Sequence, residues 1–176
     1  MLDLGGTAYN FSLKISANLL LYFTSITLKQ QKMMELNKKF IPRFNVKTTK
    51  GTDLVFGEGS EKPTLLVLFT TWCDSCQTAA PAISKAFAHV EEKISLVGIG
   101  REHGADELDA WAQKKGLAYQ LVEDPNRDLF NKFAKMHVPR IYLIDVDGSV
   151  LYQDVNWHPF MLDDLKDHVD ELMQRL

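Results

Sequence analysis

Short apolar runs separated by polar turn residues begin near residue 40, and each run predicts one strand or helix. Consecutive or alternating apolar positions predict strands at residues 44–46, 54–56, 64–70, 94–99, 117–122, 141–145 and 150–155. Apolar positions at helical spacing predict helices at residues 76–90, 106–115, 127–135 and 159–176. Residues 64–70 are apolar on both faces, which is typical of a central strand covered by helices on both sides.

Turn residues set the connections between these elements. Lys50-Gly51 joins the first two strands into a hairpin, and residues 146–149 join the last two strands in the same way. Pro81 is expected to kink the first helix about one turn after its start. The last helix is expected to bury Phe160, Leu165, Val169, Leu172 and Met173. The order of elements predicts an α/β fold with a central mixed sheet of about five strands, helices on both faces and a separate N-terminal hairpin.

The N-terminal part of the chain differs in charge from the rest. Residues 1–50 carry eight basic and two acidic side chains, whereas residues 51–176 carry twelve basic and 21 acidic ones. We therefore expect an N-terminal extension at residues 1–39 and one domain at residues 40–176. Within the extension, residues 15–28 are an apolar run, shorter than the roughly 20 residues of a spanning helix but as long as the core of a signal peptide.

Other features argue against export, because Lys14 is the only basic residue before the apolar run, the other lysines follow it, and no small-residue cleavage pattern comes after Leu28. Three interpretations of the extension stay open. It is a leader or membrane tether through residues 15–28, an amphipathic helix packed on the domain, or an addition upstream of a shorter protein that begins near Met33 or Met34.

Composition narrows the classes of function. The 176 residues are 45% hydrophobic and 24% charged, which is the composition of an ordinary globular domain, here expected to be a monomer. A net charge of -3 provides no basic field for nucleic acid. Two cysteines cannot form a disulfide-rich scaffold or a four-thiolate zinc site, and the five histidines are too scattered to complete one. No metal is therefore expected.

The two cysteines lie together in Trp72-Cys73-Asp74-Ser75-Cys76, between a predicted buried strand and a predicted helix. Cys73 falls at the helix N-terminus, where free N–H groups and the helix dipole favour a thiolate. Two intervening residues place the second sulfur one turn further, within reach of a mixed disulfide at the first. Cys73 is thus the expected nucleophile and Cys76 the expected resolving thiol.

Several motifs together resemble the thioredoxin superfamily, and most closely its TlpA/ResA-type thiol-disulfide oxidoreductases. They are Trp72 to Cys76, Pro81 five residues later, Val138-Pro139, the strand at residues 141–145 and Asp147-Gly148. The resemblance covers about residues 40–176 and implies a thioredoxin fold with an inserted helix between Gly100 and Gly116. Trp111 in that helix is expected to anchor the core.

The resemblance also implies roles for individual residues. Pro139 would follow a cis peptide bond beside the cysteines, and the backbone of Val138 would pair with an extended substrate. Trp72, Asp74, Ser75 and Pro81 would support the active site. The protein would reduce or exchange disulfides in partner proteins, with an upstream redox protein to recycle it and no cofactor beyond its own Cys73–Cys76 disulfide. The resemblance favours the cell envelope or periplasm, with the cytoplasm as the alternative.

Three positions depart from the pattern of the relatives. Val67 stands where thioredoxin has a buried aspartate, and Ala79 stands where ResA-like proteins have a glutamate. Water or another carboxylate such as Glu102 would then accept the proton of the resolving thiol. The charge of Asp74 should partly offset the effect of the helix on Cys73, which favours a reductant over a strong oxidant.

Two other functions stay open. Thr70-Thr71-Trp72-Cys73 contains the T-x-x-C pattern of peroxiredoxins, although Leu66 replaces the proline of that family, so a thiol peroxidase is one alternative. A binding module that keeps the fold but catalyses no turnover is the other.

Overall fold

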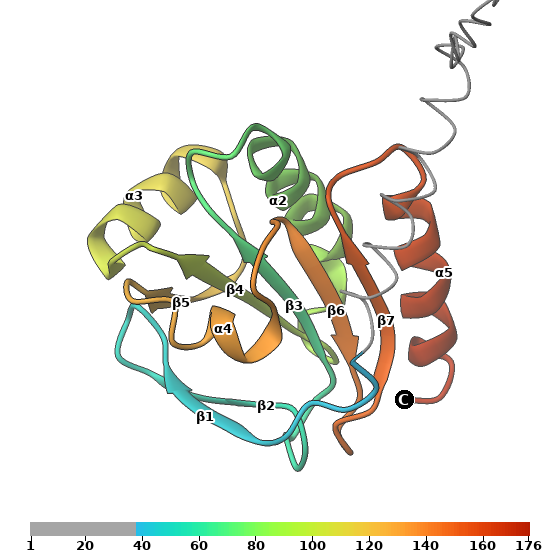
Figure 1. Cartoon of the computed structure of the whole chain (residues 1–176). Helices are drawn as coiled ribbons and strands as arrows, with labels where there is room; N and C mark the ends of the chain where they lie inside the picture. Colours follow the sequence, from blue (N-terminus) through green and yellow to red (C-terminus); the bar gives the residue numbers. More distant parts are fainter. Residues whose placement is uncertain (1–37) are drawn as a thin grey trace, which may run out of the picture. The chain divides into compact units, whose positions relative to one another are not determined.

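A computed structural model describes residues 38–176, which contain a central five-stranded sheet in the order β5-β4-β3-β6-β7 (Figure 1). The strands of this sheet are β3 (Thr64–Phe69), β4 (Ser95–Arg101), β5 (Gln120–Asp124), β6 (Arg140–Ile144) and β7 (Val150–Val155). Strand β3 lies at the centre, parallel to β4 and antiparallel to β6. All six of its residues are buried, as the apolar run predicts.

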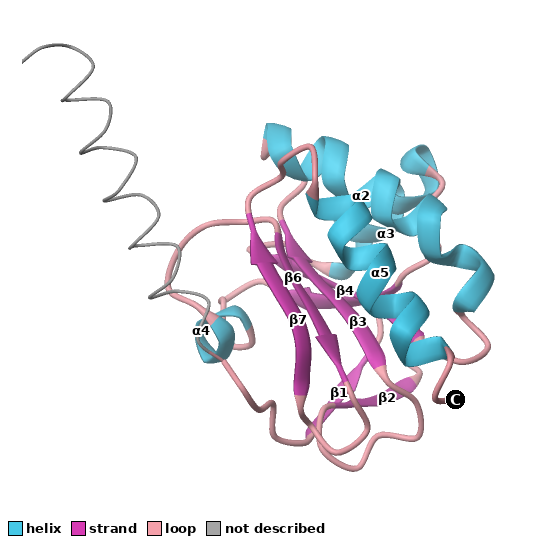
Figure 2. Ribbon diagram, turned by 90° about the vertical axis from the view of Figure 1, so that its right-hand side faces the viewer, coloured by secondary structure: helices cyan, strands magenta, loops and turns pink. Residues whose placement is uncertain are grey.

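The helices cover both faces of the sheet (Figure 2). They are α2 (Asp74–Phe87), the 3₁₀ turn η1 (Ala88–Val90), α3 (Ala105–Lys115), α4 (Phe130–Phe133) and α5 (Met161–Met173). Helices α2, α3 and α5 lie on one face and the short α4 lies on the other. The predicted mixed sheet with helices on both faces is confirmed, and α2 continues through Pro81 to Phe87.

A separate hairpin of β1 (Phe44–Lys47) and β2 (Asp53–Phe56) packs beside α4. The ring of Phe44 stacks on Phe56 at 5.0 Å and on Phe133 of α4 at 5.4 Å. Aromatic pairs at these centroid distances stabilise a contact beyond the area that they bury. The N-terminal hairpin is therefore part of the domain and covers the same face of the sheet as α4.

The inserted helix α3 ends as its sequence predicts. Gly116 adopts a left-handed conformation with φ 65°, and its N–H donates to the carbonyl oxygens of Ala112 and Gln113. The Leu117 N–H also donates to Ala112, at 3.0 Å. Leu117 therefore belongs to the helix end, and the strand predicted to begin there begins only at Gln120.

Two further boundaries differ from the prediction. The helix predicted at 127–135 is only α4, because Arg127 has a positive φ of 65° that a right-handed helix does not allow. The buried carboxylate of Asp124 accepts the N–H groups of Leu129 and Phe130 at 3.0 and 2.8 Å, which fixes the later start. In α5 the prediction for Phe160 is wrong: this ring is 71% exposed, and Met161 takes its place in the core.

The prediction of a leader, tether or packed helix within residues 1–37 lies outside the described residues. Among residues 38–176, no helix is both long enough and apolar enough to cross a membrane.

Candidate active site

The cysteine motif occupies the junction between β3 and α2, at the carboxyl end of the central strand. Cys73 is the N-cap residue of α2, with φ -85° and ψ 121°, and its carbonyl oxygen accepts the Gln77 N–H at 2.9 Å. Asp74 and Ser75 form the first helical turn, whose amides have no partner within the helix. The positive end of the helix dipole therefore lies at Cys73, as the sequence predicts.

The two sulfurs have different environments. Cys73 is partly exposed, whereas Cys76 is fully buried, and both are free thiols. Burial raises the pKa of the Cys76 thiol strongly, while a hydrogen bond from the Thr70 backbone and the positive charge of Arg101 lower it. The neighbouring Cys73 raises the pKa of Cys76 further. Cys73 is therefore the sulfur that solution can reach, and Cys76 is shielded from it.

A second loop reaches the cysteines from the start of β6. The Val138–Pro139 peptide bond is cis, as the resemblance implies, and both residues are buried. The Cys73 Sγ lies 3.7 Å from the carbonyl oxygen of Val138. Because β6 is the neighbour of β3, the sheet brings together two residues that are 65 positions apart in the chain.

The guanidinium of Arg140, the first residue of β6, is fully buried beneath this loop. Its Nη2 donates to the Met136 carbonyl at 2.8 Å, and its Nε donates to the His137 carbonyl at 3.1 Å. Charge-assisted hydrogen bonds of this kind fix backbone more firmly than neutral ones. Arg140 thereby holds the loop that places Val138 against Cys73.

Thr71, two residues before Cys73, is held by three hydrogen bonds. Its N–H donates to Nε2 of the buried His103 at 2.9 Å, its hydroxyl donates to Glu107 at 3.1 Å, and its carbonyl oxygen accepts the Gln77 side-chain amide. Nδ1 of His103 lies 2.9 Å from the Glu107 carboxylate, which lowers the pKa of Glu107. No role for His103 was predicted from the sequence, although its i,i+4 spacing with Glu107 is a signal of this pair.

Replacing His103 should therefore weaken the fold at this loop. In His103→Leu the Thr71 N–H loses its acceptor, so we expect the free energy of unfolding to fall by about 1–3 kcal/mol. Denaturant unfolding measures the change. Glu107→Gln is the control, because its amide oxygen can still accept from Thr71 or His103 on a 57% exposed side chain, so it should cost less than about 1 kcal/mol. Equal stability of His103→Leu and the wild type would contradict this account of the loop.

The other residues expected at the site lie in the cysteine motif or on the elements that flank it. The Trp72 ring is 60% exposed beside Cys73, and Pro81 lies further along α2. Val67 and Ala79 are fully buried and bring no carboxylate to the site. Trp111 does not belong to the site: it is 9% exposed and stacks on Phe69 of β3 at 5.0 Å, which confirms it as a core residue.

Glu102, considered as a proton acceptor, lies at the end of β4 in an ion-pair cluster. Its carboxylate oxygens lie 3.1 Å from Arg101 and 3.6 Å from Arg127. The Arg101 guanidinium in turn lies 5.6 Å from the centre of the Trp72 ring. Both oxygens of Glu102 are thus engaged by cations, and within this cluster it is Arg101 that contacts the motif, through Trp72.

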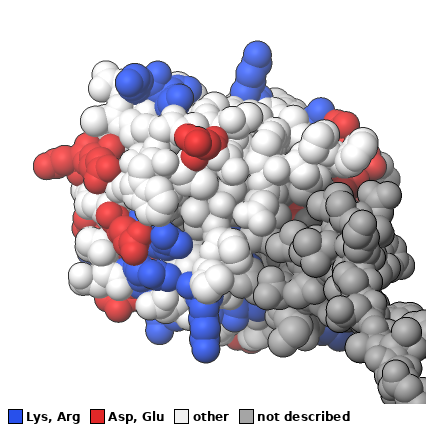
Figure 3. Space-filling model, turned by 45° about the horizontal axis from the view of Figure 1, so that its top comes forward, with Lys and Arg blue, Asp and Glu red and all other residues white. Residues whose placement is uncertain are grey.

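The surface around the motif has no dominant charge. Figure 3 shows the end of the molecule at which the loop from β3 to α2 lies, with broad uncharged areas and charged side chains of both signs. Within residues 38–176, no group of three or more His, Cys, Asp or Glu side chains is arranged to hold a metal ion. In the described part of the chain, the reactive groups of this site are thus the two thiols, and no cluster of metal ligands lies there.

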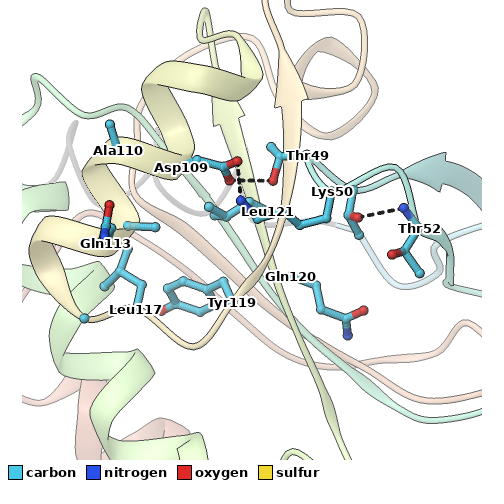
Figure 4. Close-up of a pocket in the computed structure, with 13 residues that line it drawn as sticks. Thr49, Lys50, Thr52, Asp109, Ala110, Gln113, Leu117, Tyr119, Gln120 and Leu121 are labelled. Atoms are coloured by element: carbon cyan, nitrogen blue, oxygen red, sulfur yellow. Dashed lines mark hydrogen bonds and ion pairs between the residues drawn. The ribbon is translucent and has the colours of Figure 1, made fainter.

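A cavity of about 770 Å³ lies elsewhere, between the turn of the β1–β2 hairpin, α3 and β5 (Figure 4). Asp109 of α3 is held there by the Thr49 hydroxyl at 2.7 Å and by the Lys50 ammonium at 2.6 Å. These bonds fasten the hairpin to α3. Neither cysteine lines this cavity, so it is separate from the sulfur chemistry.

Comparison with known proteins agrees with this geometry. The model of the AhpC/TSA family matches residues 38–153. The thioredoxin-like protein YneN of Bacillus subtilis is 25% identical over 118 residues, which are 65% of this chain and 68% of YneN. The thiol-disulfide oxidoreductase ResA of Bacillus thuringiensis is 22% identical over 121 residues, 68% of this chain and 69% of ResA.

Solved structures give the same fold. StoA from Bacillus subtilis superimposes with a TM-score of 0.60 at 20% identity and covers 73% of this chain and 96% of its own. A secreted disulfide oxidoreductase of Mycobacterium tuberculosis gives a TM-score of 0.60 at 22% identity, with 73% and 95% covered. The expected thioredoxin fold is confirmed by these likenesses.

Proposed function

This chain belongs to the AhpC/TSA family, and from that membership and the geometry of its two cysteines we propose that it is a thiol-disulfide oxidoreductase acting on disulfide-containing proteins. The proposal rests above all on one observation. Cys73 is partly exposed at the N-terminus of α2, and Cys76 is buried one turn behind it. An exposed nucleophile and a shielded resolving thiol are what a two-step dithiol exchange needs.

The proposed reaction moves two electrons from the protein to its substrate. The Cys73 thiolate attacks one sulfur of the substrate disulfide, which forms a mixed disulfide and releases the other substrate sulfur as a thiolate. The Cys76 thiolate then attacks the Cys73 Sγ. The bond between Cys73 and the substrate breaks, the Cys73–Cys76 disulfide forms, and the second substrate sulfur leaves and takes a proton. A dithiol protein upstream reduces the enzyme again.

We propose that the substrate chain binds at the Val138-Pro139 loop. The Val138 carbonyl oxygen lies beside the Cys73 Sγ, so a peptide that pairs with this backbone would bring its disulfide to the nucleophile. Arg140 stabilises the same loop by donating hydrogen bonds to its carbonyl groups. Binding through main-chain groups would allow substrates of varied sequence.

The proton of Cys76 is proposed to go to water. Val67 and Ala79 provide no base, and the Glu102 carboxylate is engaged by Arg101 and Arg127. The deprotonated Cys76 would then depend on favourable charges and hydrogen bonds around its sulfur rather than on a fixed general base.

The first test is the reduction potential of the Cys73/Cys76 pair. Equilibration of the wild-type chain in thiol and disulfide buffers, with the fluorescence of Trp72 as the reporter, should show one reversible two-electron transition. We expect a potential near about -270 mV, in the range of thioredoxin reductants, rather than near the about -120 mV of strong oxidants. Failure to observe a reversible couple would refute the proposal.

Two alternatives have their own readouts. A thiol peroxidase that uses Thr70 and Cys73 would consume hydrogen peroxide catalytically, and Cys73→Ser would lose that consumption. A binding module without turnover would retain partner binding after both Cys73 and Cys76 are changed to serine. Either result, together with the absence of disulfide reduction, would replace the proposed activity.

We also propose that the protein acts in the cell envelope, with the cytoplasm as the alternative. The support is its structural likeness to a disulfide oxidoreductase of Mycobacterium tuberculosis that is described as secreted. Cell fractionation distinguishes the two compartments. The substrate proteins and the upstream reductant are proposed only by class, as proteins with an accessible disulfide and an accessible dithiol.

A further inference from the structure

Arg101 is the last residue of β4, and the structure places it beside the cysteine motif. Strand β4 is parallel to β3, so the two strands end at the same edge of the sheet, with Gly100 paired to Phe69. The chain continues from Phe69 through two threonines to Trp72 and Cys73. The side chain of Arg101 therefore leaves β4 at the edge where the cysteines begin.

The guanidinium of Arg101 is held in place by two aromatic rings. Its Cζ lies 5.6 Å from the centre of the Trp72 ring and 5.0 Å from the centre of the Phe130 ring. Its side chain is only 12% exposed, and its Nε is buried with no hydrogen-bond acceptor within residues 38–176. Cation–π contacts fix such a cation in a partly desolvated position, where its field is less screened than at the surface.

The charge of Arg101 bears on the buried sulfur. Burial raises the pKa of Cys76 most, the Thr70 backbone hydrogen bond lowers it, Cys73 raises it, and Arg101 is the positive charge that lowers it. Other charged groups of this region contact either Arg101 or the loop between β3 and α2. Glu102 and Arg127 form an ion-pair cluster with Arg101, and the His103–Glu107 pair contacts the loop through Thr71.

We propose that Arg101 stabilises the Cys76 thiolate electrostatically during the resolving step, in place of the carboxylate base that Val67 and Ala79 do not provide. This inference rests on the proposed function, because it concerns the second of its two steps. Arg101 does not enter the bonds that change: the Cys76 sulfur attacks the Cys73 Sγ, the substrate sulfur leaves with the electron pair, and the Cys76 proton goes to water. Its contacts with the rings of Trp72 and Phe130 hold its positive charge at a fixed place beside the cysteine motif.

The two steps can be measured separately with dithiodipyridine, an uncharged aromatic disulfide that releases a coloured thione at each step. The reduced full chain should release one equivalent when Cys73 attacks and a second when Cys76 resolves. In Arg101→Gln we expect the second phase to slow about tenfold, because less of the Cys76 thiol is ionised once the positive charge is lost. Its pH profile should move to higher pH, while the first phase stays within about twofold of the wild type.

Two variants separate charge from packing. Arg101→Lys keeps the positive charge and should retain a second phase within about threefold of the wild type. Arg127→Gln is the matched control, because Arg127 also stacks on Phe130 and pairs with Glu102, yet it pairs with the other oxygen of that carboxylate and is not among the charges that shift the pKa of Cys76. It should change the second phase by less than about twofold. Equal slowing in Arg101→Lys and Arg101→Gln would assign the effect to packing and overturn the proposal.

Glu102→Gln gives a test of opposite sign that does not depend on the folding of an Arg101 variant. Removal of its negative charge leaves the charge of Arg101 less compensated, so the second phase should accelerate. A slower second phase in Glu102→Gln would identify Glu102 as the base and overturn the proposal. Loss of the second release from the wild-type chain would instead refute the dithiol mechanism itself, so the two failures are distinguishable.

Discussion

Substitution of Cys73 by serine is expected to abolish disulfide reduction, with a loss of turnover on the order of a thousandfold or more, because a serine hydroxyl is not ionised and does not attack sulfur. The geometry is the reason for assigning this role to Cys73 and not to Cys76. Cys73 is the partly exposed sulfur beside Val138, whereas Cys76 has no exposed surface. Turnover of a protein disulfide with excess dithiol as the reductant measures the loss.

Cys76→Ser is the matched variant and should fail in a different way. Its Cys73 still attacks the substrate, but nothing inside the protein releases the product, so the mixed disulfide accumulates. Intact-mass measurement after addition of a disulfide peptide should show one covalent adduct in Cys76→Ser and none in Cys73→Ser. Adducts in both variants, or full turnover in Cys76→Ser, would contradict the assigned roles.

Gly57→Ala is expected to be among the most destabilising single substitutions in the domain. Gly57 follows β2 with a φ of +84°, a conformation that costs an alanine about 1–2 kcal/mol. A Cβ at this position would also collide with the carbonyl oxygen of Pro42 and lie 3.0 Å from that of Ile41. Backbone cannot move away as a side chain can, so we expect the free energy of unfolding to fall by about 3 kcal/mol or more.

The residues that Gly57 touches explain the size of this effect. Ile41 is buried, its N–H donates to the Gly148 carbonyl at 2.8 Å, and its carbonyl accepts the Glu58 N–H at 3.1 Å. A displaced Ile41 would therefore disturb both the loop after β2 and the turn between β6 and β7. Denaturant unfolding of the purified variant measures the loss.

Gly51 in the β1–β2 turn provides the control for this prediction. It has a similar φ of +78°, but a Cβ there would meet no atom within 4 Å. Gly51→Ala should therefore show the conformational cost alone, about 1 kcal/mol. Equal losses in the two variants would mean that the contact with Pro42 contributes nothing.

The sequence predicted those parts of the fold that depend on local chemistry. The doubly apolar run at residues 64–70 predicted the central strand, and Gly116 predicted the end of α3. The motif from Trp72 to Cys76 predicted both the sulfur pair and the position of Cys73 at a helix N-terminus. Each of these features follows from side-chain periodicity or from a backbone conformation that a few neighbouring residues decide.

The starts of helices α4 and α5 differ from those that the apolar pattern predicted. The pattern at 127–135 predicted a long helix, but Arg127 is left-handed and Asp124 caps a later start at Phe130. Phe160 has helical spacing with the buried face of α5, yet it precedes the helix and points to solvent. Arg127 leaves the right-handed helical conformation, whereas Phe160 keeps it and is the exposed N-cap residue of α5. Apolar spacing reveals neither boundary.

Most of the elements, the sulfur pair and the class of fold thus follow from local sequence patterns. What surrounds the two sulfurs depends on the tertiary fold. Val138 reaches Cys73 because β6 pairs with β3, and Arg101 reaches Trp72 because β4 ends at the same edge of the sheet. His103 likewise holds Thr71 from 32 positions away. These contacts join residues whose separation along the chain has no fixed relation to distance in space, so the order of strands in the sheet must be known first.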